Sequence, residues 1–133
     1  MSSSKLKTLS LKGKVFSGKG NGARFIGLPW VRRQIREKLG FDPYCGTLNI
    51  RLVEDRAKRK TLMNAFKIDI VPASGFCRGK LFKAQLMDFE ECAVVIPEVA
   101  GYPEDVIEIV ASTNLRERLR LKDGDSVQVE ITL

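Results

Sequence analysis

The stretch GTLNIRLV at residues 46–53 alternates polar and apolar side chains, which is the pattern of a β-strand with one buried face. Its apolar positions, which point to one side of such a strand, are Leu48, Ile50 and Leu52. Residues 66–71 alternate in the same way. Both stretches therefore predict half-buried strands, each with one face in a core and the other face exposed.

Most of the remaining chain also has the pattern of short strands separated by turn residues. We expect further strands near residues 10–16, 24–28, 76–87, 92–96, 106–110 and 126–132. Asp123 and Gly124 mark a turn before the last of them. Many short strands, few helices and frequent turns predict a mainly β fold, a small β-barrel with peripheral helices.

One longer helix is expected outside the barrel, beginning at Pro29 and ending before Gly40. Proline suits the first turn of a helix, and glycine is a common stop. Val31, Ile35 and Leu39 recur every four residues on one face, and the basic side chains lie elsewhere. This pattern is typical of a helix that packs on a core while its charges are solvated.

A short helix is expected over residues 115–119. Asn114 and Glu117 have the spacing of a capping box, in which side chains bond the free N–H groups at a helix start. The polar run EDRAKRKTLMN at residues 54–64 fits either a loop or a short exposed helix. The sequence thus predicts one longer and one short helix and leaves a third segment open.

The length of 133 residues and the hydrophobic content of 44% fit one domain with a single core. We expect a polar N-terminal tail over residues 1–9 and the barrel domain over residues 10–133. No apolar run is long enough for a membrane span, and the start Met-Ser-Ser-Ser-Lys lacks the apolar stretch of a signal peptide. We therefore expect a cytoplasmic protein, and we expect it to be a monomer.

The chain contains no histidine, which removes the commonest general base and the commonest transition-metal ligand. Its net charge of +7 is concentrated in residues 1–41, which hold ten Lys or Arg and one acid. Such an asymmetry attracts polyanions, either nucleic acid or a nucleoside triphosphate. Cys45, Cys77 and Cys92 fit neither a disulfide framework nor a zinc site, so we expect buried or incidental thiols.

The segment SGKGNGARF at residues 17–25 has a glycine at every second position, and Lys19 and Arg24 add positive charge. Alternating glycines let a backbone come close to a ligand, and backbone N–H groups together with cations suit a phosphate. The segment lacks the Gly-Lys-Ser/Thr ending of a P-loop and the long βαβ unit of a dinucleotide-binding site. It indicates either a nucleotide-binding loop of another kind or a plain turn.

Thr47 and Asn49 lie two residues apart on the first strand described, so their side chains share the face opposite its apolar positions. A hydroxyl and an amide carbonyl are hard oxygen donors, and Mg²⁺ completes its shell with waters and substrate phosphates. The pair therefore indicates a site for a metal that a nucleotide brings with it. The alternative is the solvated side of an amphipathic strand.

Two further groups are candidates for ligand contacts. Asn114 to Glu117 offers a helix start with Arg116, which suits an anion and is equally explained by capping. Glu108 lies on a strand whose neighbouring side chains are apolar and face the other way. Its carboxylate could accept hydrogen bonds from a hydroxyl-rich ligand or act as a base, but solvent-facing positions of this kind are more common.

Several motifs together resemble the archaeal CTP-dependent riboflavin kinases. They are, in order, SGKGNGARF, LGFDPY, GTLN, VVIPE, DVIEIVASTNLRERL and LKDGD. The likeness runs from about Gly13 to Ile131, and the shared order makes it specific although each motif alone is weak. It implies a six-stranded cradle-loop barrel, related to the swapped-hairpin barrels, that phosphorylates riboflavin to flavin mononucleotide (FMN) and converts CTP to CDP.

The resemblance also implies roles for individual residues. The positions that would hold the cytidine nucleotide are Lys19, Gly20, Asn21, Gly22, Ala23, Arg24, Thr113, Asn114, Leu115 and Arg116. Thr47 and Asn49 would coordinate Mg²⁺, and Glu108 would bind the flavin. Relatives have a threonine eight residues before that glutamate as a second flavin contact, where this chain has Ala100. Tyr102 is the nearby candidate to compensate, by stacking or hydrogen bonding.

Catalysis is then expected to come mostly from positioning and charge neutralisation, with Glu108 as the candidate base. Two other function classes stay open. A DNA-binding regulator with a related barrel would use the basic N-terminal part, and a non-catalytic flavin-binding module would fit Ala100. Neither alternative needs Thr47 and Asn49 beside a triple-glycine loop, so the kinase is favoured and nucleic acid is not expected as a partner.

Overall fold

The computed structural model describes most of the chain, namely residues 8–18, 21–52, 56–63, 68–70, 79–87, 90–98 and 100–132. Its elements follow the order β1 (Thr8–Phe16), α1 (Asn21–Gly27), α2 (Pro29–Leu39), β2 (Leu48–Arg51), α3 (Arg56–Met63), β3 (Ile68–Ile70), β4 (Gly79–Leu86), β5 (Glu90–Pro97), β6 (Val106–Val110), α4 (Leu115–Leu119) and β7 (Ser126–Thr132). The expected mainly β fold is confirmed.

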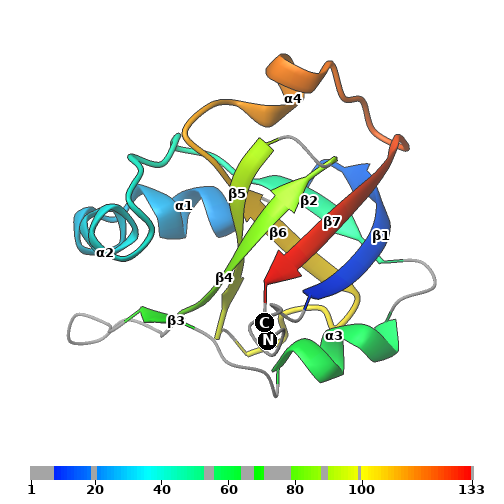
Figure 1. Ribbon diagram of the computed structural model, residues 1–133, viewed down its shortest axis with the longest axis horizontal. Coiled ribbons are helices and arrows are strands. Elements are labelled where there is room, and N and C mark those ends of the chain that lie inside the picture. Colours follow the sequence, from blue (N-terminus) through cyan, green and yellow to red (C-terminus); the bar gives the residue numbers. More distant parts are fainter. Residues whose placement is uncertain are drawn as a thin grey trace, which may run out of the picture.

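Six antiparallel strands close into a barrel in the order β4-β5-β6-β2-β1-β7 (Figure 1). Closure occurs where β7 pairs with the second half of β4, as in Ala84 opposite Ile131. The first half of β4 pairs instead with the short β3, as in Gly79 opposite Ile70. The predicted six-stranded barrel is therefore correct, and β3 is an additional strand outside the ring.

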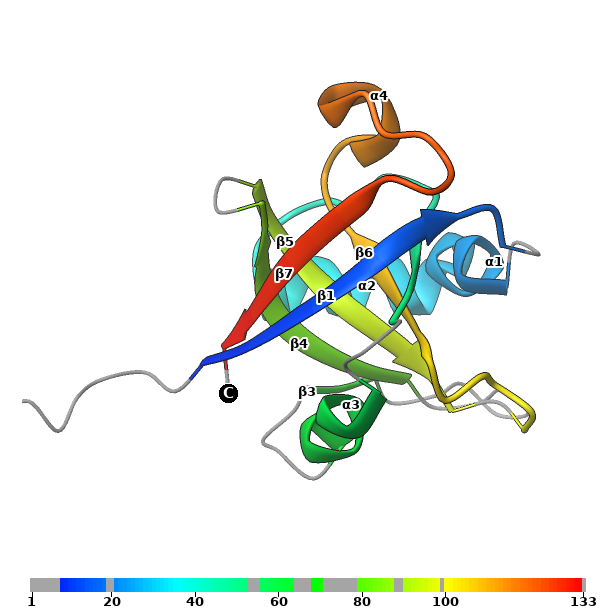
Figure 2. The same ribbon diagram turned by 90° about the vertical axis from the view of Figure 1, so that its right-hand side faces the viewer.

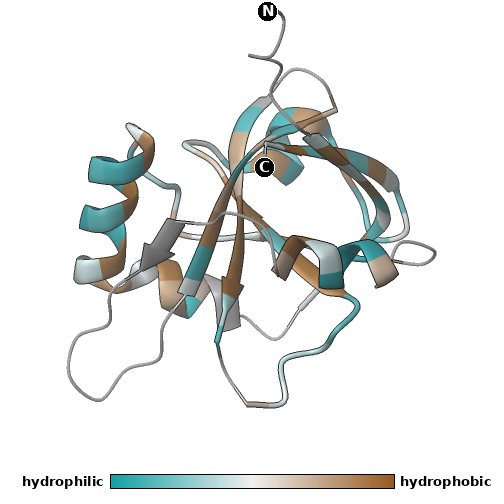
Figure 3. Ribbon diagram, turned by 60° about the horizontal axis from the view of Figure 1, so that its bottom comes forward, coloured by the Kyte–Doolittle hydropathy of each residue, from teal (hydrophilic) through white to brown (hydrophobic). Residues whose placement is uncertain are grey.

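Apolar residues pack in two clusters, one on each side of the barrel wall. The larger cluster fills the interior with side chains such as Leu11, Ile50, Phe82, Leu86, Ile107 and Val129. The second lies outside β4, β5 and β6, beneath α1 and α2, and includes Ile26, Val31, Ile35, Leu81 and Val95. Since β5 is covered on both faces, its run CAVVI is apolar without alternation. By contrast, α2 carries both apolar and polar residues along its length (Figure 3).

The two predicted helices are confirmed, together with the signals that predicted them. Gly40 ends α2 in the left-handed conformation (φ 84°), and its N–H donates to the carbonyl of Arg36. Asn114 caps α4 by accepting a hydrogen bond from the backbone N–H of Glu117. Gly124, in the expected turn before β7, also has a positive φ of 93°.

The strand expected over residues 24–28 is wrong, because residues 24–27 belong to α1. Phe25 and Ile26 are neighbours in sequence, yet both are buried, at 6% and 0% exposure. A strand with one covered face would bury only one of the two, whereas a helix packed across the barrel wall can bury both. The Phe25 ring lies so close to Gly79 of β4 that a Cβ there would be 2.6 Å from it.

Residues 54–64, for which the sequence allowed either a loop or a short helix, contain the helix α3. It covers one end of the barrel, while α4 lies at the other (Figure 2). It is not simply exposed, because Leu62 is fully buried in the interior cluster. The N-terminal boundary of the barrel domain differs slightly from the expected one. The strand β1 begins at Thr8, opposite Thr132, so it includes two residues of the predicted tail. Among the described residues, none of the helices has the length and apolar content needed to cross a bilayer.

Candidate active site

Glu108 is buried in the wall of the barrel, with 3% of its surface exposed. It lies on β6 directly opposite Asn49 of β2, so the two side chains share the outer face. Thr47 donates a hydrogen bond from Oγ1 to Glu108 Oε1 over 2.6 Å, and Tyr102 donates from its hydroxyl to Oε2 over 2.7 Å. The solvent-facing alternative for Glu108 is therefore wrong, because the residue is buried and Thr47 and Tyr102 both bond its carboxylate.

Tyr102 is held in the form that donates a hydrogen bond. Burial raises the pKa of its phenol well above the usual value, and the negative charge of Glu108 raises it further. The hydroxyl therefore keeps its proton across the physiological range. Ala100, by contrast, is exposed in the turn before Tyr102.

A cavity of about 340 Å³ opens beside Glu108, and we call it the β6 cavity. Residues that line it include Phe16, Gly18, Asn49, Arg51, Tyr102 and Glu108. Its walls combine two aromatic rings with a buried carboxylate, an amide and a guanidinium. That mixture suits a small aromatic molecule that also carries hydrogen-bonding groups.

A second cavity, of about 230 Å³, lies next to α4, and we call it the α4 cavity. Residues that line it include Tyr44, Thr47, Thr113, Asn114, Leu115 and Arg116. The Asn114 amide donates to the Tyr44 hydroxyl over 3.2 Å, which ties the cap of α4 to the segment before β2. Thr113 to Arg116, predicted as one group, do line one cavity together.

The two cavities meet at the hydrogen bond between Thr47 and Glu108. Thr47 lines the α4 cavity, Glu108 lines the β6 cavity, and their oxygens are 2.6 Å apart. Ligands bound in the two cavities would therefore be separated by little more than these side chains. Thr47 and Asn49, the two predicted metal ligands, both lie next to Glu108 here, and their side-chain oxygens are hard donors of the kind that Mg²⁺ prefers.

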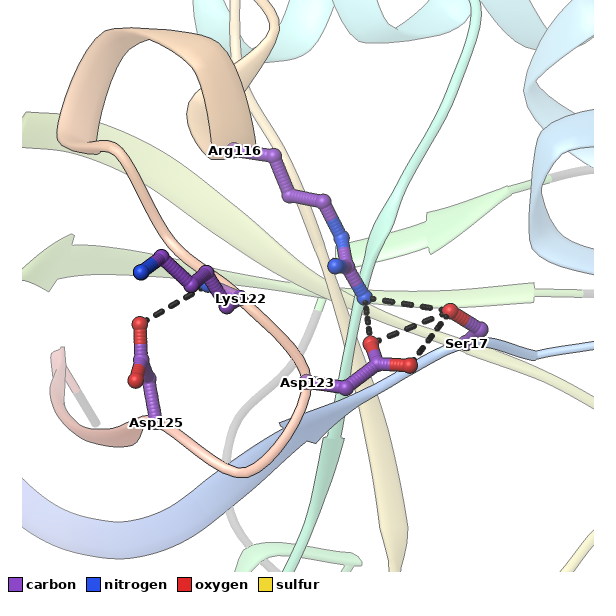
Figure 4. A network of polar contacts seen from close by, with 5 residues as sticks. All are labelled: Ser17, Arg116, Lys122, Asp123 and Asp125. Carbon is purple, nitrogen blue, oxygen red and sulfur yellow. Dashed lines mark hydrogen bonds and ion pairs between the residues drawn. The ribbon is translucent and has the colours of Figure 1, made fainter.

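Arg116 reaches from α4 to the end of β1 through a small polar network (Figure 4). Its guanidinium donates to the Asp123 carboxylate, which also accepts a hydrogen bond from Ser17 at 2.9 Å. The hydrogen bond from Arg116 and then that from Ser17 hold the pKa of Asp123 below its ordinary value. Arg116 is thereby fixed beside the start of the glycine-rich segment.

The glycine-rich segment is only partly a loop. Lys19 and Gly20 lie outside the described residues, and the positions from Asn21 to Arg24 form the first part of α1, so the single loop predicted there is wrong. Gly18 lies against β2, because a Cβ on it would be 2.8 Å from the Asn49 side chain. Gly18 therefore lies next to Asn49, one of the two predicted metal ligands.

The sequence did not single out several side chains that the structure places around the site, namely Phe16, Ser17, Tyr44, Arg51, Arg59 and Asp123. Asp123 had been assigned only to a turn, and no pattern singled out Arg59 in its basic run. Of the cysteines, Cys92 is buried and Cys45 is exposed, while Cys77 lies outside the described residues. Cys45 accepts a hydrogen bond from Arg32 at 2.7 Å. This contact holds the thiol in place and indicates no catalytic role for it.

Known proteins are similar to this sequence across most of its length. The family model CTP-dep_RFKase, described as "Domain of unknown function DUF120", matches residues 15–131. A riboflavin kinase of Archaeoglobus fulgidus is 40% identical over 95% of this chain and 56% of its own length. One of Pyrobaculum islandicum is 43% identical over 95% and 62%, and one of Sulfurisphaera tokodaii is 37% identical over 96% and 98%. The chain thus spans about three fifths of the first two relatives and nearly all of the third.

Proposed function

This chain belongs to the CTP-dep_RFKase family, and from that premise we propose that it transfers the γ-phosphoryl group of CTP to the 5′-hydroxyl of riboflavin, giving FMN and CDP. The observation that carries the proposal is the Thr47–Glu108 hydrogen bond at the junction of two cavities. A kinase needs two ligands bound side by side with their reacting groups in contact. The names of the relatives support riboflavin, and the name of the family model supports CTP.

In this proposal the β6 cavity takes the flavin. Its volume of about 340 Å³ lies within the range of small-molecule sites. Glu108 would accept a hydrogen bond from a hydroxyl or ring N–H of riboflavin, and Phe16 and Tyr102 provide apolar ring surface. Each Glu108 oxygen accepts one hydrogen bond from the chain and has a second lone pair for a flavin group, so we assign this residue to holding the flavin.

The α4 cavity takes the nucleotide in the same proposal. Arg116 supplies positive charge, and Thr113 and Asn114 supply polar groups at the start of α4. The glycine-rich segment would approach the phosphates from the other side, since Ser17 is tied to Arg116 through Asp123. Contacts with the cytosine ring inside this cavity would select CTP over the other nucleotides.

Thr47 and Asn49 would hold Mg²⁺ together with oxygens of the nucleotide. The metal would neutralise charge on the phosphates as it builds up during transfer. The residues of the β6 and α4 cavities would bring the 5′-hydroxyl of riboflavin in line with the γ-phosphorus of CTP. The bond from that phosphorus to the β–γ bridging oxygen breaks, the bond to the riboflavin oxygen forms, and the hydroxyl proton leaves to solvent.

Incubation of the purified chain with Mg²⁺, riboflavin and each of the four nucleoside triphosphates tests the proposal. Chromatography with fluorescence detection separates FMN from riboflavin. We expect FMN with CTP and much less with the other three nucleotides. A folded chain that yields no FMN would contradict the kinase assignment, and salt-sensitive binding to duplex DNA by such a chain would favour the regulator instead.

A further inference from the structure

Two charged side chains are buried among the described residues, Glu108 and Arg59. The proposed function uses Glu108 and leaves Arg59, with 8% of its surface exposed, unexplained. A buried guanidinium is costly unless it is paired and hydrogen-bonded. Its position on α3, at the end of the barrel opposite α4, therefore calls for a physical reason (Figure 2).

Arg59 contacts the strand that carries Glu108. Its Nε donates to the carbonyl of Val106 over 2.9 Å, and Val106 itself lines the β6 cavity. Burial lowers the pKa of the guanidinium, while the carboxylates of Glu104 and Asp105 act against that shift. Because arginine holds its proton far above neutral pH, the group stays positively charged.

Arg59 also contacts Tyr102, the other hydroxyl partner of Glu108. Its guanidinium carbon lies 5.8 Å from the centre of the Tyr102 ring, within the range of a cation–π contact. The Tyr102 hydroxyl in turn donates to Glu108 Oε2 over 2.7 Å. A continuous chain of contacts thus runs from α3 through Tyr102 to the carboxylate in the cavity.

The helix that carries Arg59 is itself held firmly against the barrel. Leu62 is fully buried in the interior cluster, and Lys58 donates from Nζ to the carbonyl of Ser10 on β1 over 3.2 Å. Arg59 therefore extends from a fixed helix rather than from a loose surface segment. The exposed Ala100 offers no hydroxyl, so among the described residues the donors to the Glu108 carboxylate are Thr47 and Tyr102.

We propose that Tyr102 and Arg59 are positioning residues for the flavin, with Arg59 holding the Tyr102 ring and Tyr102 holding the Glu108 carboxylate toward the β6 cavity. This inference rests on the proposed function, because it assumes that the β6 cavity takes riboflavin. Without the Tyr102 hydroxyl, one oxygen of a buried carboxylate loses its donor, and the carboxylate can turn toward Thr47. Flavin binding then weakens, while the α4 cavity keeps its shape.

Titration of riboflavin into the full chain without nucleotide, followed by quenching of flavin fluorescence, tests the inference. Tyr102→Phe removes one hydroxyl and keeps the ring, and we expect a riboflavin Kd about 10-fold higher than that of the wild type. Arg59→Lys keeps the charge but lacks the planar guanidinium, and we expect a rise of about 3-fold to 10-fold. Arg33→Lys, which changes an exposed arginine on α2, is the matched control and should bind as the wild type does.

Two further readouts separate positioning from a general loss of structure. The KM for CTP should change by less than about 2-fold in Tyr102→Phe, since the hydroxyl does not line the α4 cavity. The double variant should weaken binding by less than the product of the two single effects, because Arg59 acts through Tyr102.

The possible outcomes distinguish a failure of the positioning role from a failure of the proposed function. If the wild type binds riboflavin and Tyr102→Phe binds equally well, the positioning role is overturned. Equal losses for riboflavin and CTP would also overturn it, in favour of a purely structural role. If Tyr102→Phe fails to fold, the Arg59→Lys variant tests the proposal instead. Riboflavin binding equal to that of the wild type in Arg59→Lys would overturn the positioning role of Arg59. A wild-type chain that binds no riboflavin would overturn the proposed function and this inference together.

Discussion

Gly18 lies against the side chain of Asn49 so closely that a Cβ on Gly18 would be 2.8 Å from the Asn49 carboxamide. The glycine-rich segment and the proposed metal ligands therefore depend on each other. We expect Gly18→Ala to displace the Asn49 carboxamide and to lower kcat/KM for CTP by about 10-fold or more. Steady-state kinetics at saturating riboflavin measures this.

The matched control for that variant is Gly27→Ala at the end of α1, where a new Cβ would meet no atom within 4 Å. This change should leave kcat/KM unaltered. Equal activity of both variants would show that the contact between Gly18 and Asn49 has no part in catalysis.

Thr47 offers a direct test of the metal assignment. Thr47→Val keeps the branched shape and removes the hydroxyl, so we expect the Mg²⁺ concentration for half-maximal rate to rise about 10-fold. Thr47→Ser keeps a hydroxyl and should restore most of the wild-type response. Rates measured against Mg²⁺ concentration, with circular dichroism to verify folding, make the comparison. Identical Mg²⁺ dependence in all three proteins would remove Thr47 from the metal site.

Asp123 should make stability depend on pH. Its folded pKa lies below the ordinary 3.8, because it accepts hydrogen bonds from Arg116 and Ser17. A carboxyl with a depressed folded pKa adds stability that is fully present above the unfolded pKa and is lost as the pH falls through the folded pKa. We therefore expect the Tm of the wild type to exceed that of Asp123→Asn at about pH 7 and the gap to close below pH 3.8.

Thermal unfolding followed by circular dichroism at several pH values measures that gap. A difference in Tm that stays constant from neutral to strongly acidic pH would contradict the role of the Asp123 charge.

The packing of α1 on the barrel can be tested at Gly79. A Cβ there would lie 2.6 Å from the Phe25 ring, so Gly79→Ala should force α1 away from β4. Overpacking of this kind typically costs about 1–3 kcal/mol in the free energy of unfolding. Urea denaturation measures the loss, with Gly27→Ala again as the control. A Gly79→Ala chain as stable as the wild type would argue against this docking of α1.

Local pattern was enough to predict the parts of the fold whose structure is set locally. The strands β6 and β7 begin and end where alternation and turn residues place them, and the caps of α2 and α4 involve neighbours in sequence. The helix α1 could not be predicted in this way. In sequence, its adjacent Phe25 and Ile26 have the pattern of a short strand. Both are buried because the helix packs on the barrel wall, which local pattern does not reveal.

The candidate site shows the same division. Thr47, Asn49 and Glu108 were identified from strand pattern and family resemblance, and β2 and β6 do bring them together. The burial of Glu108 could not be predicted, since one of its hydrogen-bond donors, Thr47, lies 61 residues away in the chain. Arg59 had no local signal either, because its burial comes from the docking of α3 on the barrel end.

The central claim is that a phosphoryl group passes from a nucleotide in the α4 cavity to a flavin in the adjoining β6 cavity. Incubation of the chain with CTP labelled at its γ-phosphate, riboflavin and Mg²⁺ tests it most directly. The account predicts that the label appears in FMN, with one labelled FMN formed for each CDP. Label found only in inorganic phosphate or retained in CTP, with riboflavin unchanged, would contradict it.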